Sequence, residues 1–174
     1  MIRRVTQIPA KLRSRLFGDR PRMTLRYALW SFISGTAGIL AIYGIATLAG
    51  QTLLIGSFGA SAVLLFGAMD SPLAQPRNVV GGHVISAAIA VAAVALAGVS
   101  PLSMALAVGL SILAMNVSHT THPPGGATAL IGVQGGAGPL FIVTPVLAGA
   151  LILLGMALFT NNVVYHRQYP KHWL

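Results

Sequence analysis

The hydrophobic residues of this chain gather into six apolar runs joined by short connections. The runs cover residues 27–49, 52–69, 79–99, 102–117, 124–133 and 140–164. A helix that crosses a bilayer needs about 20 apolar residues, so the first, third, fourth and sixth runs predict full or nearly full spans. Glycines interrupt the second run, and the fifth is long enough only for a half-helix. The pattern predicts an all-α integral membrane protein with four long transmembrane helices and two interrupted or half-helix segments.

Composition supports the membrane class. Hydrophobic residues make up 55% of the 174 residues and charged residues only 7%, whereas soluble domains carry roughly 25% charged residues. A soluble protein of this length could not bury so much apolar surface. The chain has no cysteine, which excludes disulfides and thiol catalysis.

Basic residues lie mainly before the first run. The chain has 11 Lys and Arg against 2 Asp and Glu, and most of the basic residues precede residue 27. Because positive charge collects on the cytoplasmic side of membrane spans, we interpret this excess as a topology signal and expect no nucleic-acid partner. Apolar residues at near-helical spacing predict a basic amphipathic arm over residues 1–26 on the cytoplasmic leaflet. We expect a protein of the bacterial inner (plasma) membrane with a cytoplasmic N-terminus.

The connections leave two topologies open. If all six runs cross, every basic residue faces the cytoplasm and the uncharged connections lie on the other side. If the second and fifth runs re-enter instead, only Arg77 changes sides. Charge bias therefore favours six crossings, by one residue.

Two similar hexapeptides suggest an internal repeat. GASAVL at 59–64 and GATALI at 126–131 lie 67 residues apart, and the same shift places the first run on the fourth and the third on the sixth. We predict membrane repeats over 27–99 and 100–166, followed by a short cytoplasmic tail at 167–174. Three crossings per copy would invert the second copy, and inverted repeats with broken helices are typical of transporters. Chance is the alternative, since such small-residue strings are common in membrane helices.

The stretch SHTTHPPGGATALI at 118–131 is polar and rich in Pro and Gly, yet it lies between apolar runs. Irregular backbone at membrane depth must be buried in protein or line a wet cavity. Pro123 and Pro124 predict an extended segment that ends in a helix start near Pro124 or Gly125. Unpaired N–H groups at that start, with the helix dipole, would attract an anion.

The repeat places a second half-helix start opposite the first, lined with hydroxyl groups and without a nearby carboxylate. This arrangement predicts a site for a small anion near the midplane, at the facing N-termini of the two half-helices. The alternative is that the glycine motifs only pack helices together. The candidate substrate-binding residues are Ser57, Gly59, Ala60, Ser61, Thr121, His122, Gly125, Gly126, Ala127 and Thr128.

Three further residues are candidates for gating or proton coupling. They are His83, His119 and Arg77, for which an interfacial histidine and an ion pair between Arg77 and Asp70 are the alternatives. His119 and His122 have a spacing that could suit a metal. With no cysteine and no acid nearby, we expect neither a metal nor a cofactor.

The words GSFGASAVLLF, SPLAQPRN, GGH and HPPGGATAL resemble motifs of the HPP family of integral membrane proteins, named for the sequence found here at His122 to Pro124. The resemblance covers residues 56–159. It implies a fold usually described with four membrane helices, and plant chloroplast and cyanobacterial members are associated with nitrite transport.

The resemblance and the predicted anion site together favour a transporter or channel for a small inorganic anion, with nitrite as the favoured cargo. The alternative is a non-transporting scaffold or assembly protein. An intramembrane enzyme is disfavoured, because beyond the N-terminal arm the chain has one Asp and no Glu for acid–base chemistry. We expect the lipid bilayer as a partner, and the glycine-rich faces are compatible with a homo-oligomer.

Overall fold

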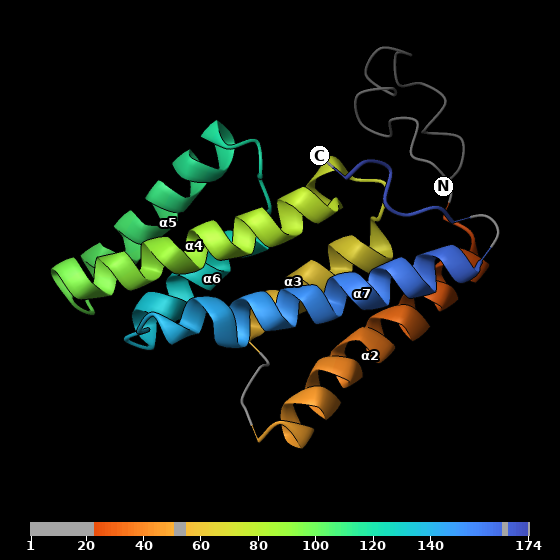
Figure 1. The fold of residues 1–174 in the computed structure, drawn as a ribbon. Helices are drawn as coiled ribbons and strands as arrows, with labels where there is room; N and C mark the ends of the chain where they lie inside the picture. The colour runs from red at the N-terminus through yellow and green to blue at the C-terminus, as the bar shows by residue number, and fades with distance from the viewer. Residues whose placement is uncertain (1–22, 51–54, 165–166, 174) are drawn as a thin grey trace, which may run out of the picture.

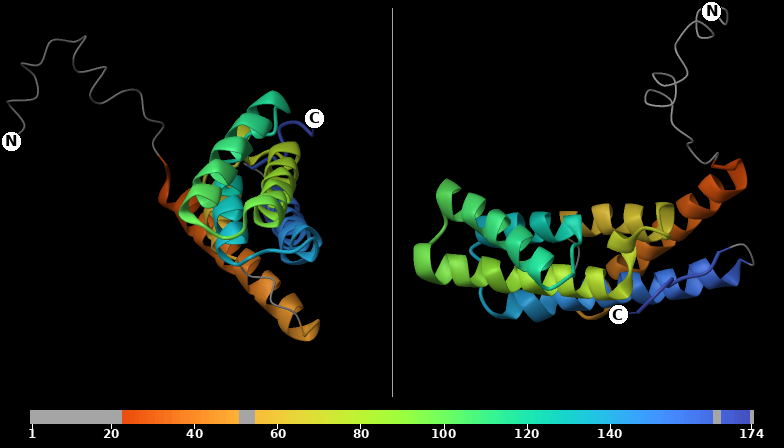
Figure 2. Two further views of the ribbon diagram at one scale, coloured as in Figure 1. Left: turned by 90° about the vertical axis from the view of Figure 1, so that its left-hand side faces the viewer. Right: turned by 90° about the horizontal axis from the view of Figure 1, so that it is seen from above.

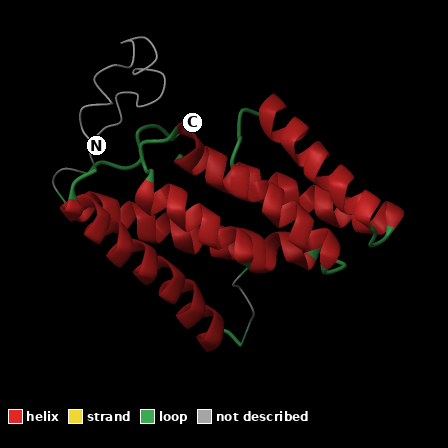
Figure 3. Ribbon diagram, turned by 180° about the vertical axis from the view of Figure 1, so that it is seen from behind, coloured by secondary structure: helices red, strands yellow, loops and turns green. Residues whose placement is uncertain are grey.

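The computed structural model describes residues 23–50, 55–164 and 167–173. Within these ranges the chain is helical and contains no β-strand (Figure 3), which confirms the all-α prediction. Most of the predicted amphipathic arm lies outside the described residues. The helices are α2 (Leu25–Leu48), α3 (Gly56–Ala62), α4 (Pro76–Ala97), α5 (Pro101–Val117), α6 (Pro123–Gln134) and α7 (Ala148–Val163).

Three helices of the described chain are long and apolar enough to cross a membrane. They are Leu25–Leu48, Pro76–Ala97 and Ile142–Val163. The last joins a π-helical turn, η4 (Ile142–Leu147), to α7. The prediction of four long spans is not confirmed, because α5 has 17 residues and falls short of the usual length of about 20.

Each of the two interrupted runs contains a short helix. In the second run, α3 has 7 residues and continues as the π-helical turn η2 (Val63–Gly67). In the fifth run, α6 has 12 residues. A 3₁₀ turn, η3 (Pro72–Ala74), connects η2 to α4.

Proline marks the start of three of these helices. Pro76, Pro101 and Pro123 each occupy the first position of a helix, where the missing N–H group costs no hydrogen bond. Ser100 adds a capping box with Ser103 at the start of α5, which satisfies two further N–H groups. The helix that we expected to begin near Pro124 or Gly125 therefore begins slightly earlier.

The helices form two flanks around a central group. Figure 1 shows α4 and α7 running across the molecule, with α5 at one flank and α2 at the other. The two short helices, α3 and α6, lie behind α4 and α7, as the view from above in Figure 2 confirms. In this arrangement α2 packs on α7, α5 packs on α4 and α6, and α3 contacts α6.

The surface of the flanking helices is apolar. Leu29 and Phe32 of α2, Leu106 of α5 and Phe159 of α7 are each more than half exposed. Exposure of such large apolar side chains to water is unfavourable, whereas contact with lipid is favourable. The surface agrees with the membrane class predicted from composition.

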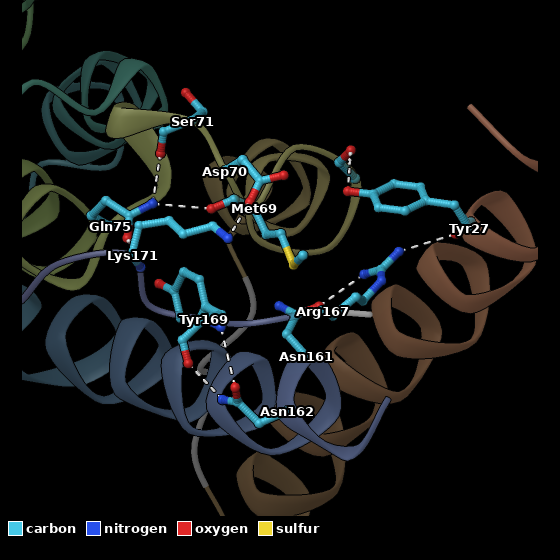
Figure 4. Close-up of polar contacts among 11 residues, drawn as sticks. Tyr27, Met69, Asp70, Ser71, Gln75, Asn161, Asn162, Arg167, Tyr169 and Lys171 are labelled. Atoms are coloured by element: carbon cyan, nitrogen blue, oxygen red, sulfur yellow. Dashed lines mark hydrogen bonds and ion pairs between the residues drawn. The ribbon is translucent and has the colours of Figure 1, made fainter. Parts of the chain in front are cut away.

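Residues 167–171, which follow α7, make polar contacts with α2, with η2 and with the turn before α4 (Figure 4). Arg167 is only 3% exposed. Its Nη1 donates to the carbonyl oxygen of Phe66 at 3.1 Å and to Asn161 Oδ1 at 2.8 Å. Its Nη2 donates to the carbonyl oxygen of Tyr27 at 3.0 Å and to Ser31 Oγ at 2.8 Å. One arginine therefore ties α2, η2 and α7 together.

We call the polar contacts of Arg167, Tyr169 and Lys171 with the rest of the protein the C-terminal clasp. The last two of these residues bind the turn before α4. Tyr169 Oη donates to the carbonyl oxygen of Ala74 at 2.7 Å, and the Lys171 backbone N–H donates to Gln75 Oε1 at 2.8 Å. Lys171 also pairs with Asp70, with 3.2 Å between Nζ and Oδ1. The alternative of an ion pair between Asp70 and Arg77 is therefore wrong.

Candidate functional site

A buried group of polar side chains lies where α3, α4 and α6 meet. It contains Ser57 and Ser61 of α3, His83 of α4, and His122 and Thr128 at the start of α6. None of the five is more than 1% exposed. We call this group the His–hydroxyl cluster.

The five side chains form one continuous line of hydrogen bonds. His122 Nδ1 lies 2.8 Å from the carbonyl oxygen of Leu73, and its Nε2 lies 2.9 Å from Ser61 Oγ. Ser61 Oγ is also 2.8 Å from His83 Nε2. His83 Nδ1 is 2.8 Å from Thr128 Oγ1, which lies 2.9 Å from Ser57 Oγ. Each ring nitrogen of both histidines therefore has a partner.

The positions of α3 and α6 explain how these side chains meet. Ser57 and Ser61 are four residues apart and so share one face of α3. The first contacts Thr128, inside α6, and the second contacts His122, at its start. The two helices therefore run antiparallel, with the start of each helix beside the second turn of the other, and His83 reaches between them from α4.

Glycines allow this close approach. A β-carbon on Gly125 would lie 2.7 Å from the carbonyl oxygen of Gly82, and one on Gly82 would lie 2.5 Å from the β-carbon of His122. A β-carbon on Gly81 would lie 2.6 Å from Thr120 Cγ2. Only glycine fits at these crossings of α4 with α6 and the segment before it.

The predicted role of unpaired backbone N–H groups does not fit this geometry. Since α6 starts with two prolines, its first free donor is the N–H of Gly125, which donates to the carbonyl oxygen of His122 at 2.8 Å. The N–H groups of Gly126, Ala127 and Thr128 lie beyond the first three helical positions, where they pair within the helix. The groups that face one another in the cluster are side chains.

Several predicted binding residues lie away from the cluster. Gly59 and Ala60 are exposed, and Gly59 lines a cleft of about 590 Å³ along α2. A β-carbon on Gly126 would meet Val108 of α5 at 3.9 Å. Thr121 is half-buried and donates to Asn116 Oδ1 at 2.9 Å.

The three gating candidates have different surroundings. His83 is fully buried at the centre of the cluster, with a hydrogen-bond partner at each ring nitrogen. His119 is exposed and has a positive φ of 56°. Arg77 is exposed and donates from Nη2 to the carbonyl oxygen of Ser118 at 2.8 Å. The signal that could have placed His83 in the site is the preceding Gly82, which lets α6 approach.

The electrostatic surroundings of the cluster contain no negative side chain. Neither α3 nor α6 has an Asp, Glu, Lys or Arg, and the one charged residue of α4 is Arg77 at its exposed N-terminal end. The cluster offers hydroxyl and imidazole groups, which can donate hydrogen bonds to an anion. A cation site would need oxygens that carry negative charge.

Comparison with known proteins places the chain among membrane proteins. The transmembrane region of the HPP family matches residues 20–170. A transmembrane protein of Dictyostelium discoideum is 46% identical over 156 residues, which are 83% of this chain and 55% of that protein. Another from the same organism is 44% identical over 156 residues, covering 83% of this chain and 50% of that protein. No solved structure matches the chain.

The chain spans about half the length of these two relatives. The family match includes all the described helices and the motif His122-Pro123-Pro124. The histidine of this motif belongs to the cluster, and its prolines are the first residues of α6. With this coverage, the chain belongs to the HPP family of integral membrane proteins.

Proposed function

We propose that this protein transports a small inorganic anion across the membrane, with nitrite as the favoured cargo, and that it is not an enzyme. The observation that carries the proposal is the His–hydroxyl cluster, a fully buried group of hydroxyls and imidazoles between two half-length helices. A membrane protein gains little stability from such a polar group over an apolar core, since each member must find a partner. Buried polar residues in membrane helices are therefore functional candidates.

The cluster would bind the anion through side chains. Ser57, Ser61 and Thr128 each carry one hydroxyl proton that can turn toward a new acceptor. An anion beside Ser57 and Thr128 would replace their mutual 2.9 Å hydrogen bond with two bonds to itself. Hydrogen bonds to a charged acceptor are stronger than those between neutral groups, so the two new bonds offset part of the cost of removing the anion from water.

The arrangement of helices supports an inverted repeat of three segments each. The first helix of each proposed repeat packs on the last helix of the other repeat. In this way α2 packs on α7, and α5 packs on α4. The middle helices α3 and α6 lie antiparallel across the cluster. Transporters with inverted repeats bind substrate at this interface near the midplane. We propose the same location here, in a bacterial inner membrane with the N-terminus in the cytoplasm.

Nitrite uptake into liposomes tests the proposal. The variant Thr128→Val keeps the shape of the side chain but removes its hydroxyl, and Thr47→Val is the matched control. Thr47 is exposed on α2, and its hydroxyl donates to the carbonyl oxygen of Tyr43 within the same helix. We expect T128V to lower uptake about tenfold, as the loss of one such hydrogen bond implies, and T47V to match wild type.

Chloride, nitrate and formate as competitors would define which anions the site accepts. Normal uptake by folded T128V would show that the cluster is not the binding site. No uptake of any of these anions by folded wild-type protein would contradict transport itself.

One observation favours the scaffold function as the second candidate. The contact of Gly125 with Gly82 explains the paired glycines by helix packing alone, as in small-residue membrane interfaces. The scaffold function predicts that the protein moves no anion and that T128V changes only stability.

A further inference from the structure

The hydrogen-bond line through the cluster has a defined direction when both histidines are neutral. A carbonyl oxygen can only accept, so the 2.8 Å contact with Leu73 requires a proton on His122 Nδ1. The Nε2 of neutral His122 then accepts from the Ser61 hydroxyl. Two other acceptors lie near that hydroxyl, His83 Nε2 at 2.8 Å and the carbonyl oxygen of Ser57 at 3.3 Å. Both histidines keep a partner at Nε2 only when the Ser61 hydroxyl donates to one of them and accepts from the other.

The rest of the line follows from this first bond. Because the one proton of Ser61 is used, its oxygen must accept from His83 Nε2. His83 Nδ1 then has no proton and accepts from the Thr128 hydroxyl. With that proton used, Thr128 of the neutral cluster can only accept from Ser57, whereas in the structure Thr128 Oγ1 donates to Ser57 Oγ. Every donor in the neutral cluster points from Ser57 toward Leu73.

We propose that the His–hydroxyl cluster takes up one proton together with each monovalent anion, which makes the protein a proton–anion symporter. This inference rests on the proposed transport function. A proton that arrives at Ser57 Oγ displaces the old hydroxyl proton to Thr128, and the same exchange passes along the line. The Thr128 proton moves to His83 Nδ1, the His83 Nε2 proton to Ser61, and the Ser61 proton to His122 Nε2.

The protonated cluster keeps all of its hydrogen bonds. His122 now donates from both nitrogens, to Leu73 and to Ser61. Ser61 donates to His83, His83 to Thr128, and Thr128 to Ser57 as in the structure, which is the reverse of the neutral direction. When the anion binds, it takes the place of Ser57 as the acceptor from Thr128. One proton enters at Ser57 and one extra proton ends on His122. The number of protons therefore balances.

The charge of the protonated cluster needs a partner. The groups that face the two histidines are neutral: the Phe58 ring of α3, whose centroid lies 5.4 Å from that of His83, the hydroxyls of the cluster, and the Leu73 carbonyl. Arg77, on α4, donates to the carbonyl oxygen of Ser118, and Asp70 pairs with Lys171 at the surface. Burying a lone charge is costly, so the bound anion supplies the balancing charge and the proton and anion bind together.

The test measures anion uptake and internal acidification in the same liposomes. Purified wild-type protein is reconstituted with an internal pH dye and given nitrite, and then nitrate, whose acid does not cross lipid unaided. Protein-free vesicles supply the nitrous acid background. We expect one proton to enter per anion, and an uptake rate that does not change when valinomycin and potassium set the membrane potential.

A variant tests the line itself. Ser61→Ala removes the hydroxyl that joins the two imidazoles by hydrogen bonds. Ser34→Ala is the matched control, because Ser34 is a fully buried serine of α2. Wild type and S34A should take up anion faster as the external pH falls, whereas the residual uptake by S61A should lose this pH dependence.

The outcomes separate the two proposals. Anion uptake without acidification, or uptake that follows the membrane potential, would overturn the symport and leave anion transport standing. A full pH response in S61A would overturn the relay through Ser61. The absence of all anion uptake by folded protein would instead overturn the transport function on which the symport depends.

Discussion

Gly125 of α6 crosses Gly82 of α4 so closely that a β-carbon on Gly125 would lie 2.7 Å from the Gly82 carbonyl oxygen. The backbones of the two helices therefore touch at this point. The same crossing positions His83, which follows Gly82, and His122, which precedes α6, on either side of Ser61. The glycines of GGH and HPPGG therefore affect the site by setting how closely α4 and α6 approach each other.

Replacement of Gly125 tests this contact. Gly125→Ala should lower the free energy of unfolding by about 1–3 kcal/mol, since an added methyl group in a tight contact forces the backbones apart. Gly126→Ala is the matched control, because its β-carbon would meet only Val108, at an ordinary 3.9 Å. Thermal unfolding in detergent measures both. Equal melting temperatures for the two variants would contradict the crossing.

Arg167 should contribute strongly to stability. Arg167→Ala removes the donors to the carbonyl oxygens of Phe66 and Tyr27 and the stacking of the guanidinium 4.0 Å from the Tyr27 ring centroid. We expect a loss of about 3 kcal/mol, because buried acceptors lose charged donors. Lys171→Ala, which breaks an exposed ion pair, should cost less than about 1 kcal/mol. Similar losses in both variants would show that the Arg167 contacts contribute little.

Tyr169 should make the C-terminal clasp sensitive to alkali. Burial raises the pKa of the Tyr169 phenol above the value of about 10 for an exposed tyrosine. Its contribution to stability is therefore complete below about pH 10 and declines as the pH rises toward the folded-state pKa. Tyr169→Phe loses the bond to Ala74 and should be less stable than wild type by about 1 kcal/mol at pH 8.

The comparison across pH provides the test. The stability difference between wild type and Y169F should shrink above about pH 10, because the phenylalanine cannot ionise. Chemical or thermal unfolding at several pH values measures this difference. A constant difference up to strongly alkaline pH would contradict a buried, protonated Tyr169.

The half-helices could be predicted from sequence because their signals are local. Pro123 and Pro124 set the start of α6, and the glycines of residues 56–59 mark the irregular start of the second run. The span in 102–117 was overestimated, since its apolar run is long enough only for the 17 residues of α5. Hydropathy measures apolar length and does not report whether a helix reaches both membrane surfaces.

The composition of the cluster was only partly predictable. Hydroxyls and His122 come from the polar stretch and its repeat, but His83 lies in a mostly apolar helix, where Gly82 and Ser86 are its nearest small or polar neighbours on the chain. Arg167 was expected in a cytoplasmic tail, and its burial depends on backbone acceptors near η2. A π-helical turn shifts the backbone hydrogen-bond pattern and leaves carbonyl acceptors for side chains. The residue pattern of the sequence does not predict such a turn.

Gly149 of α7 offers a test that joins packing to transport. A β-carbon there would collide with the ring of Phe58, whose edge packs against His83. Gly149→Ala should push this ring toward the cluster and lower nitrite uptake several-fold, in addition to a packing cost of about 1–3 kcal/mol. Gly155→Ala is the control on the same helix, because no atom lies within 4 Å of its added β-carbon. The uptake assay is run on folded protein at a temperature below both melting points. If G149A then transports as fast as G155A, the position of Phe58 does not control the cluster.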